Sequence, residues 1–336
     1  LFLWAPLNGK EKFELVWRGY RTELILNGET VDEEWPIGDC FRGDDLMFRD
    51  ETGLITGLSF APAAPETEEP SKIFTGAQFY APKQGEYNVG DCMPFFHDGV
   101  YHAYFLKDRH SHQSKWRLGA HQFAHISSKD LIHWETHPLA VPITHDWEGS
   151  ICTGSFLHAK GKFYAFYAVR MSDYTSARLS WATSDDGIHF TKSERYFSLD
   201  YPYETTSARD PEVFLGEDGN YHMLVTTDLL EGAAKGRTGC LAHLISSDLE
   251  NWEQLPPFYV PGYTDQPECT DYFSWNGYYY LIFSNYGCAK YRYSKQPFGP
   301  WLKPEDEVLD GLLYRVPKTA AFTGNRRIAC GFLTLA

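Results

Sequence analysis

Apolar and polar residues alternate in short segments along most of this chain, and pairs of these segments are joined by glycine turns. The turn occurs at Asp98-Gly99, Lys160-Gly161, Asp218-Gly219, Asn276-Gly277 and, more weakly, Thr323-Gly324-Asn325. Alternation with a period of two predicts β-strands, and a short glycine turn between two such strands predicts an antiparallel hairpin. The turns are 62, 58, 58 and 47 residues apart, which leaves room for four strands and their loops in each unit. The pattern therefore predicts a repeated β-unit over residues 71–336.

A second segment follows the first three hairpins and combines a strand end, a polar turn and a large aromatic residue. Its copies are Ser128–Trp134, Ser184–Phe190 and Ser247–Trp252, with a looser copy from Ser294 to Trp301. Repeats of this length that each supply a small sheet are typical of β-propellers. We therefore predict an all-β fold with a five-bladed β-propeller, whose last blade is expected to lack some of its strands. A β-sandwich with accidental self-similarity is the alternative.

The region before the repeats has a different character. Glu23–Leu26 and Thr30–Asp32 flank Asn27-Gly28, which is a strong hairpin signal. Residues 61–70 form an acidic, proline-rich stretch that is typical of a linker or a surface loop. We predict that residues 1–70 form a small β-rich module or extension followed by a linker. Packing on the propeller is its expected role, and sugar binding is the alternative.

Composition narrows the classes of partner. Aromatic residues make up 16% of the 336 residues, and they suit both strands and sugar-stacking surfaces. The formal net charge of −15 disfavours nucleic acids and anionic membranes, which leaves neutral substrates as the easier partners. No apolar run is long enough to cross a bilayer, and Leu1–Leu7 is too short for a signal peptide. The seven cysteines have no CxxC spacing, so we expect reduced, mostly buried thiols and a cytoplasmic protein.

Three acidic residues occupy nearly the same place in three copies of the repeat. Asp91 precedes its turn glycine by eight residues, and Asp210 and Glu268 precede theirs by nine. Each acid therefore falls near the start of the first strand of its unit. Because the first strands of propeller blades line the central channel, all three carboxyl groups are expected to meet at one site.

Four sequence segments also resemble motifs of family 32 of the glycoside hydrolases, which contains invertases, inulinases and levanases. Ala208–Pro211 contains the Arg-Asp-Pro motif of that family, and Pro267–Asp271 resembles its Glu-Cys-Pro-Asp motif. Phe123–Leu131 is similar to Trp-Gly-His-Ala-Val-Ser-x-Asp-Leu, and Ser150–Ser155 is similar to a Phe-Ser-Gly-Ser stretch. The resemblance covers residues 74–336 in the order of the family.

The resemblance implies a role for each acid. Asp91 would be the nucleophile, Glu268 the acid/base, and Asp210 a stabiliser of the transition state that hydrogen-bonds sugar hydroxyls. Arg209 would hold a carboxylate or a hydroxyl in register. Crowding of the three acids should raise at least one pKa and keep that group protonated near neutral pH.

Further residues are candidates for contacts with the substrate. Cys152 and Thr153 lie in the segment that resembles the Phe-Ser-Gly-Ser stretch, and Trp116 could stack on a sugar ring or fill a gap in the packing. Cys269 directly follows Glu268, so strand alternation predicts that its side chain points away from the channel. His110-Ser111-His112 lacks the helical spacing of a zinc peptidase, and we predict neither a metal nor a cofactor.

The match is poorest around the predicted nucleophile. The family motif Trp-Met-Asn-Asp-Pro-Asn-Gly corresponds here to Tyr87–Pro94, in which only the Asp is clearly kept. Gly90, Cys92 and Met93 replace Asn, Pro and Asn, and Leu106 replaces a Gln. The resemblance implies that those amides help to hold a terminal fructose, so a different selectivity among sugars is expected here.

The three acids and the resemblance together predict a retaining glycoside hydrolase that cleaves β-fructofuranosides or a related furanoside, with an oligosaccharide or a small glycoside as its substrate. Retention needs one ionised carboxylate to attack the anomeric carbon and one carboxylic acid to protonate the leaving oxygen, about 5 to 5.5 Å apart. An inverting arabinosidase or xylosidase on a similar propeller is one alternative, with carboxyl groups about 6.5 to 9.5 Å apart. A carbohydrate-binding propeller without turnover is the other.

Overall fold

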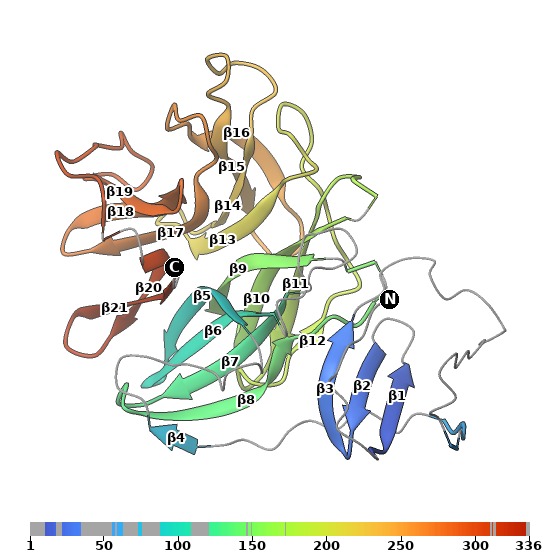
Figure 1. Cartoon of the computed structure of the whole chain (residues 1–336). Coiled ribbons are helices and arrows are strands. Elements are labelled where there is room, and N and C mark those ends of the chain that lie inside the picture. Colours follow the sequence, from blue (N-terminus) through green and yellow to red (C-terminus); the bar gives the residue numbers. More distant parts are fainter. Residues whose placement is uncertain are drawn as a thin grey trace.

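A computed structural model describes residues 11–17, 22–34, 56–57, 59–62, 73–75, 88–108, 121–145, 147–148, 150–171, 173–309, 311 and 314–333. The secondary structure of these residues consists of β-strands, and they include no helix that could cross a membrane. Figure 1 shows five sheets arranged around a common centre and a separate small sheet near the N-terminus. The predicted all-β propeller is therefore confirmed.

The sheets follow one another in chain order. Blade one contains β5 (Asn88–His97), β6 (Val100–Asp108), β7 (Gln122–Ser128) and β8 (His133–Val141), with β4 (Ile73–Thr75) paired against β8. Blade two contains β9 (Ser150–Ala159), β10 (Lys162–Arg170), β11 (Arg178–Ser184) and β12 (Thr191–Lys192). Blade three contains β13 (Arg209–Leu215), β14 (Tyr221–Asp228), β15 (Gly239–Ser246) and β16 (Glu253–Tyr259). Blade four contains β17 (Glu268–Trp275), β18 (Tyr278–Asn285) and β19 (Cys288–Ser294), and blade five contains β20 (Tyr314–Phe322) and β21 (Arg326–Leu333).

The first strands of the five blades form a closed ring. β5 contacts β9, β9 contacts β13, β13 contacts β17, β17 contacts β20, and β20 returns to β5. Ala320 and Phe322 of blade five pack in one apolar cluster with residues of blade one, and the Tyr101 hydroxyl donates to the Ile328 carbonyl over 3.1 Å. The ring therefore closes between the last and the first blade, and its inner strands surround one channel.

The five glycine turns join the first and second strands of the blades, as the sequence predicts. Asn276 and Gly277 both have positive φ, at 51° and 76°, and the Asp98-Gly99 and Lys160-Gly161 pairs share this geometry. Two consecutive positive φ angles give the tight turn whose twist matches paired strands, and glycine adopts such angles without a steric cost.

The second repeated segment forms the turn between the third and fourth strands. Ser128 Oγ accepts from the amides of Asp130 and Leu131, and Asp130 Oδ1 accepts from the amides of Ile132 and His133. The same hydrogen bonds recur at Ser184 and Asp186 and at Ser246 and Asp248. The aromatic residue that follows packs against an apolar cluster between blades in each copy: Trp134, Phe190 and Trp252.

The N-terminal region contains a three-stranded sheet of its own. Strands β1 (Phe13–Trp17), β2 (Thr22–Leu26) and β3 (Glu29–Glu34) pair in that order, and Asn27-Gly28 forms the predicted turn between the last two. The domain boundary at residue 70 stays a prediction.

Candidate active site

Each inner strand carries a β-bulge near its start, and the three predicted acids lie at such bulges. The pairing register shifts between Val89 and Cys92 on β5, between Arg209 and Glu212 on β13, and between Glu268 and Asp271 on β17. Equivalent shifts occur on β9, opposite Tyr167, and on β20, between Arg315 and Lys318. A bulge adds one residue to the strand and changes the direction of its side chains. The repeated bulge therefore aims side chains from all five blades at one end of the channel.

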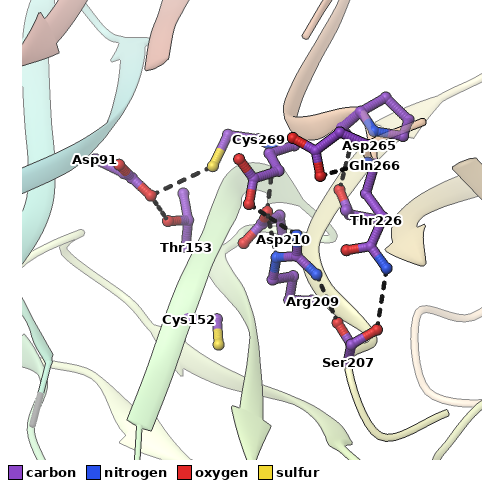
Figure 2. A network of polar contacts seen from close by, with 12 residues as sticks. Asp91, Cys152, Thr153, Ser207, Arg209, Asp210, Thr226, Asp265, Gln266 and Cys269 are labelled. Atoms are coloured by element: carbon purple, nitrogen blue, oxygen red, sulfur yellow. Dashed lines mark hydrogen bonds and ion pairs between the residues drawn. The ribbon is translucent and has the colours of Figure 1, made fainter. Parts of the chain in front are cut away.

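Asp91 accepts hydrogen bonds from two other blades. Thr153 Oγ1 of β9 donates to Asp91 Oδ2 over 2.5 Å, and the Cys269 thiol of β17 donates to the same oxygen over 3.3 Å (Figure 2). Thr153 is fully buried, whereas Asp91 is half-buried. These two hydrogen bonds hold the carboxyl group through its Oδ2 oxygen.

Asp210 is the buried member of the three acids. Its side chain is only 5% exposed, and its Oδ2 accepts from the Cys269 amide over 3.1 Å and lies 3.7 Å from Arg209 Nε. Burial raises the pKa of Asp210 to about 6, and the nearby charges of Glu268 and Asp91 add to this effect against the opposing charge of Arg209. The pKa that is raised among the three acids is therefore that of Asp210, with burial as the main cause and like charges as a smaller one.

Glu268 is the more accessible acid. Its side chain is 38% exposed, and its Oε1 accepts from Arg209 Nη2 over 2.7 Å. Arg209 is anchored in turn by a hydrogen bond from Nη1 to the Ser207 carbonyl over 2.9 Å (Figure 2). The guanidinium group lies between two of the acids, as its predicted role in holding a carboxylate requires.

The prediction that Cys269 points away from the channel is wrong. Its amide contacts Asp210 and its thiol contacts Asp91, so it connects two of the acids (Figure 2). Strand alternation fails here because Cys269 has a φ of 50° within the bulge of β17. Burial is the main cause that raises the pKa of this thiol well above its ordinary value, and the nearby acids add to it. Cys269 is therefore a neutral hydrogen-bond donor.

The predicted substrate contacts have different outcomes. Thr153 lies in the site beside Asp91. Cys152 is buried in the apolar cluster between blades two and three, where a thiol serves packing, so the expected substrate contact does not fit its position. Trp116 and His110 lie outside the described residues.

Three further charged residues lie on the inner strands β13, β17 and β20, and the sequence did not indicate them as a group. Lys318 Nζ donates to Glu212 Oε2 over 2.7 Å, and Asp271 Oδ2 accepts from the amide and the hydroxyl of Thr319 over 2.8 and 2.7 Å. Glu212, Asp271 and Lys318 are all buried, at no more than 7% exposure. The available signal was a charged residue inside an otherwise uncharged strand segment, such as Lys318 within Val316–Phe322.

Apolar packing occupies the positions next to Asp91 where the sequence departs from the expected motif. A Cβ atom at Gly90 would lie 3.1 Å from the Leu106 Cβ, so this residue and Leu106 fit together closely. Met93 is buried, and its sulfur accepts from the Gly154 amide over 3.2 Å. Gly90 has no side chain, and the side chains of Met93 and Leu106 are apolar. They cannot make the hydrogen bonds that amide side chains would offer to a sugar.

Comparison with known proteins places this chain in a family. Residues 74–299 match the model of the glycosyl hydrolases family 32 N-terminal domain. The chain belongs to glycoside hydrolase family 32. A probable sucrose-6-phosphate hydrolase of Psychromonas ingrahamii is 26% identical over 284 residues, which cover 76% of this chain and 49% of that protein. A levanbiose-producing levanase of Bacillus subtilis is 25% identical over 250 residues, which cover 68% of this chain and 43% of that protein. The family 32 chain therefore spans about half the length of these curated relatives.

Solved structures agree on the fold. The fructan 1-exohydrolase IIa of Cichorium intybus superposes with a TM-score of 0.60 at 19% identity, covering 76% of this chain and 52% of that one. The sucrose-6-phosphate hydrolase of Lactobacillus gasseri superposes with a TM-score of 0.61 at 21% identity. This superposition covers 74% of this chain and 54% of that one. A thermostable family-43 glycoside hydrolase superposes with a TM-score of 0.53 at 17% identity. This superposition covers 74% of this chain and 84% of that one. Proteins with low sequence identity to this family 32 chain therefore share its propeller architecture.

The raised pKa of Asp210 predicts that Asp210→Asn stabilises the protein at high pH. An acid whose pKa is higher in the folded than in the unfolded state favours folding at low pH, and this contribution is lost as the pH rises from about 4 through about 6. A shift of this size corresponds to at most about 3 kcal/mol. We expect the variant to gain about 1 to 3 kcal/mol in the free energy of unfolding at pH 8 and little at pH 4.

Denaturant unfolding of both proteins at pH 4, 6 and 8 measures this difference. Asp185→Asn, at a carboxylate whose side chain is 84% exposed, is the matched control and should show no such pH dependence. A variant at Asp210 that is less stable than the parent at pH 8 would contradict the prediction.

Proposed function

We propose that this chain is a retaining glycoside hydrolase that cleaves β-fructofuranosides or a related furanoside. The observation that carries the proposal is the connection of Asp91, Asp210 and Glu268 through Cys269 and Arg209. One acid presents a carboxylate fixed through a single oxygen, another is accessible and paired with a cation, and the third is buried between them. Membership of family 32 supports the same chemistry.

In the first step, Asp91 Oδ1 attacks the anomeric carbon while Glu268 protonates the leaving oxygen. The hydrogen bonds from Thr153 and Cys269 to Oδ2 hold the carboxylate in the orientation for attack. Glu268 is accessible enough to reach the leaving group, and Arg209 fixes its position. The product of this step is an ester between the sugar and Asp91.

In the second step, water attacks the ester and Glu268 accepts its proton. Formation of the ester removes the negative charge of Asp91, and the proton given to the leaving group leaves Glu268 as the carboxylate that acts as the base. Asp210 lies close to both groups and can accept hydrogen bonds from sugar hydroxyls, which strengthen as the oxocarbenium ion develops.

The apolar surroundings of Asp91 predict a substrate other than plain sucrose as the best one. Gly90, Met93 and Leu106 offer no side-chain amide, and a site without such partners discriminates poorly among the hydroxyl groups that they would bind. In a panel of sucrose, sucrose 6-phosphate, inulin, levan, kestose and arabinan oligosaccharides, we expect another furanoside to give a kcat/KM at least about tenfold above that of sucrose. Efficient turnover with sucrose as the best substrate would contradict this inference.

The stereochemistry of the released sugar tests the class of mechanism. Proton NMR of the first product formed from the best substrate in the panel should show retention of the anomeric configuration. Inversion would favour the arabinosidase or xylosidase alternative. Binding of a sugar in the panel without release of any product would favour the carbohydrate-binding alternative.

A further inference from the structure

Lys318 reaches across the channel to strands that are not its neighbours. It projects from β20, whose neighbours in the ring are β17 and β5, yet its ammonium group donates to Glu212 Oε2 of β13 over 2.7 Å and to the Gly154 carbonyl of β9 over 2.9 Å. Its side chain is only 5% exposed. One cation therefore ties three blades together inside the channel.

Both partners of Lys318 are next to active-site residues. Gly154 directly follows Thr153, the donor to Asp91, and it lies so close to β10 that a Cβ atom there would meet the Phe166 carbonyl oxygen at 1.7 Å. Glu212 is two residues after Asp210, at the end of the bulge that carries this acid. Lys318 thus contacts the backbone in the bulge of β9 and a side chain at the end of the bulge of β13.

The electrostatic surroundings of Lys318 are dominated by acids. Glu212 of β13 forms an ion pair with Lys318, and the charge of Asp271 on β17 also acts on it. Both carboxyl groups act in turn on Arg327 of β21. Cys269 also lies within the field of Lys318, and it contacts Asp91 and Asp210. Burial raises the pKa of Glu212 to about 7 against the opposing effect of the Lys318 charge.

A purely structural ion pair is the simpler explanation, and the geometry argues against it. Buried ion pairs add little to stability compared with well-packed apolar side chains, because both ions must lose their hydration. Lys318 instead contacts the residue that follows Thr153 and a residue two positions after Asp210. The effect of this cation is therefore expected in the positions and charges of these active-site groups.

We propose that Lys318 is a positioning residue of the active site, which holds the bulges of Thr153 and Asp210 in place and favours the ionised form of Asp210. This inference rests on the function proposed above for that site. It assigns no contact between Lys318 and the substrate. A buried positive charge near a carboxyl group favours its ionised form, so removal of the charge should raise the pH at which Asp210 ionises.

The test compares Glu212→Gln with the double variant Glu212→Gln/Lys318→Met. The glutamine cannot take up a proton when the lysine is removed, so the comparison changes a single charge. From the single to the double variant we expect kcat to fall at least about tenfold with KM within about threefold, and the acidic limb of the kcat/KM profile to move up by about one pH unit. Circular dichroism in the near ultraviolet establishes that both variants are folded.

Lys192→Met is the matched control. Lys192 forms another largely buried ion pair, with Glu148, but it lies on β12, the outermost strand of blade two. Its loss should lower stability and leave the acidic limb where it is in the parent protein. An acidic limb that does not move between the two Glu212 variants would overturn the proposal, whatever happens to kcat.

A second measurement keeps the inference separate from the proposed function. In protein labelled with ¹³C at the aspartate carboxyl carbons, the signal of Asp210 is assigned by its loss in Asp210→Asn. Its titration midpoint should rise by about one pH unit from the single to the double variant. Absence of turnover on every sugar of the panel would refute the proposed function alone, whereas an unchanged midpoint would refute the role of Lys318.

Discussion

Asp91→Asn is expected to lower kcat/KM by about 10,000-fold or more on natural sugars and on activated aryl fructosides alike. An amide oxygen is a poor nucleophile, so the covalent intermediate cannot form, and protonation of the leaving group does not compensate for this loss. The hydrogen bond from Thr153 can still be accepted by the amide oxygen, so the structure of the site should persist. Initial rates with the best sugar of the panel and with p-nitrophenyl β-fructofuranoside measure the effect.

A matched control for this variant is available on the same hairpin. Asp98 lies in the turn between β5 and β6, where it is exposed, and Asp98→Asn should keep nearly full activity. Residual activity of Asp91→Asn above about 1% of the parent, in protein free of deamidation by mass spectrometry, would count against its role as the nucleophile.

Glu268→Gln should separate the two kinds of substrate. With a natural sugar, whose leaving group is a poor one, loss of the acid is expected to lower kcat/KM by about 1,000-fold. With a p-nitrophenyl leaving group, formation of the intermediate needs little protonation and should slow by no more than about tenfold. Hydrolysis of the intermediate lacks its base in both cases, so a burst of nitrophenol should precede a slow steady state.

Stopped-flow absorbance resolves the burst, and its amplitude should approach one nitrophenol per active site. Glu253→Gln on β16, at an exposed position, is the control and should show no burst. Equal losses of kcat/KM on the two substrates would exclude Glu268 as the acid. In that case Asp210, with its pKa of about 6, would be the next residue to test.

The hairpins and the blade order could be predicted because their signals are local. A turn with two consecutive positive φ angles needs residues such as Asn27-Gly28 or Asn276-Gly277, and the adjacent strands show the period of two. The number of these turns gives the number of blades, and their spacing leaves room for the strands of each blade. The offset of Asp91, Asp210 and Glu268 from their turns then places the acids at one end of the channel, because equivalent positions in a closed ring face the same centre.

The direction of individual side chains could not be predicted in the same way. Strand alternation places Cys269 outside the channel, but the bulge of β17 turns it toward Asp91. The same rule does not show that Cys152 is buried between blades while Thr153 faces the site. A bulge depends on how a strand pairs with its neighbour, which no single strand sequence specifies.

The sequence by itself determined the repeat, the hairpin turns, the three acids and the resemblance to family 32, because each depends on residues a few positions apart or on motifs in a fixed order. Only the tertiary structure decided which acid has the raised pKa, since burial and the approach of charges from other blades set that of Asp210. It alone brought Lys318 to Glu212, 106 residues away in the chain, and to Gly154, 164 residues away. Contacts of this kind arise only when the ring of blades closes, because closure brings strands that are distant in sequence to the same channel.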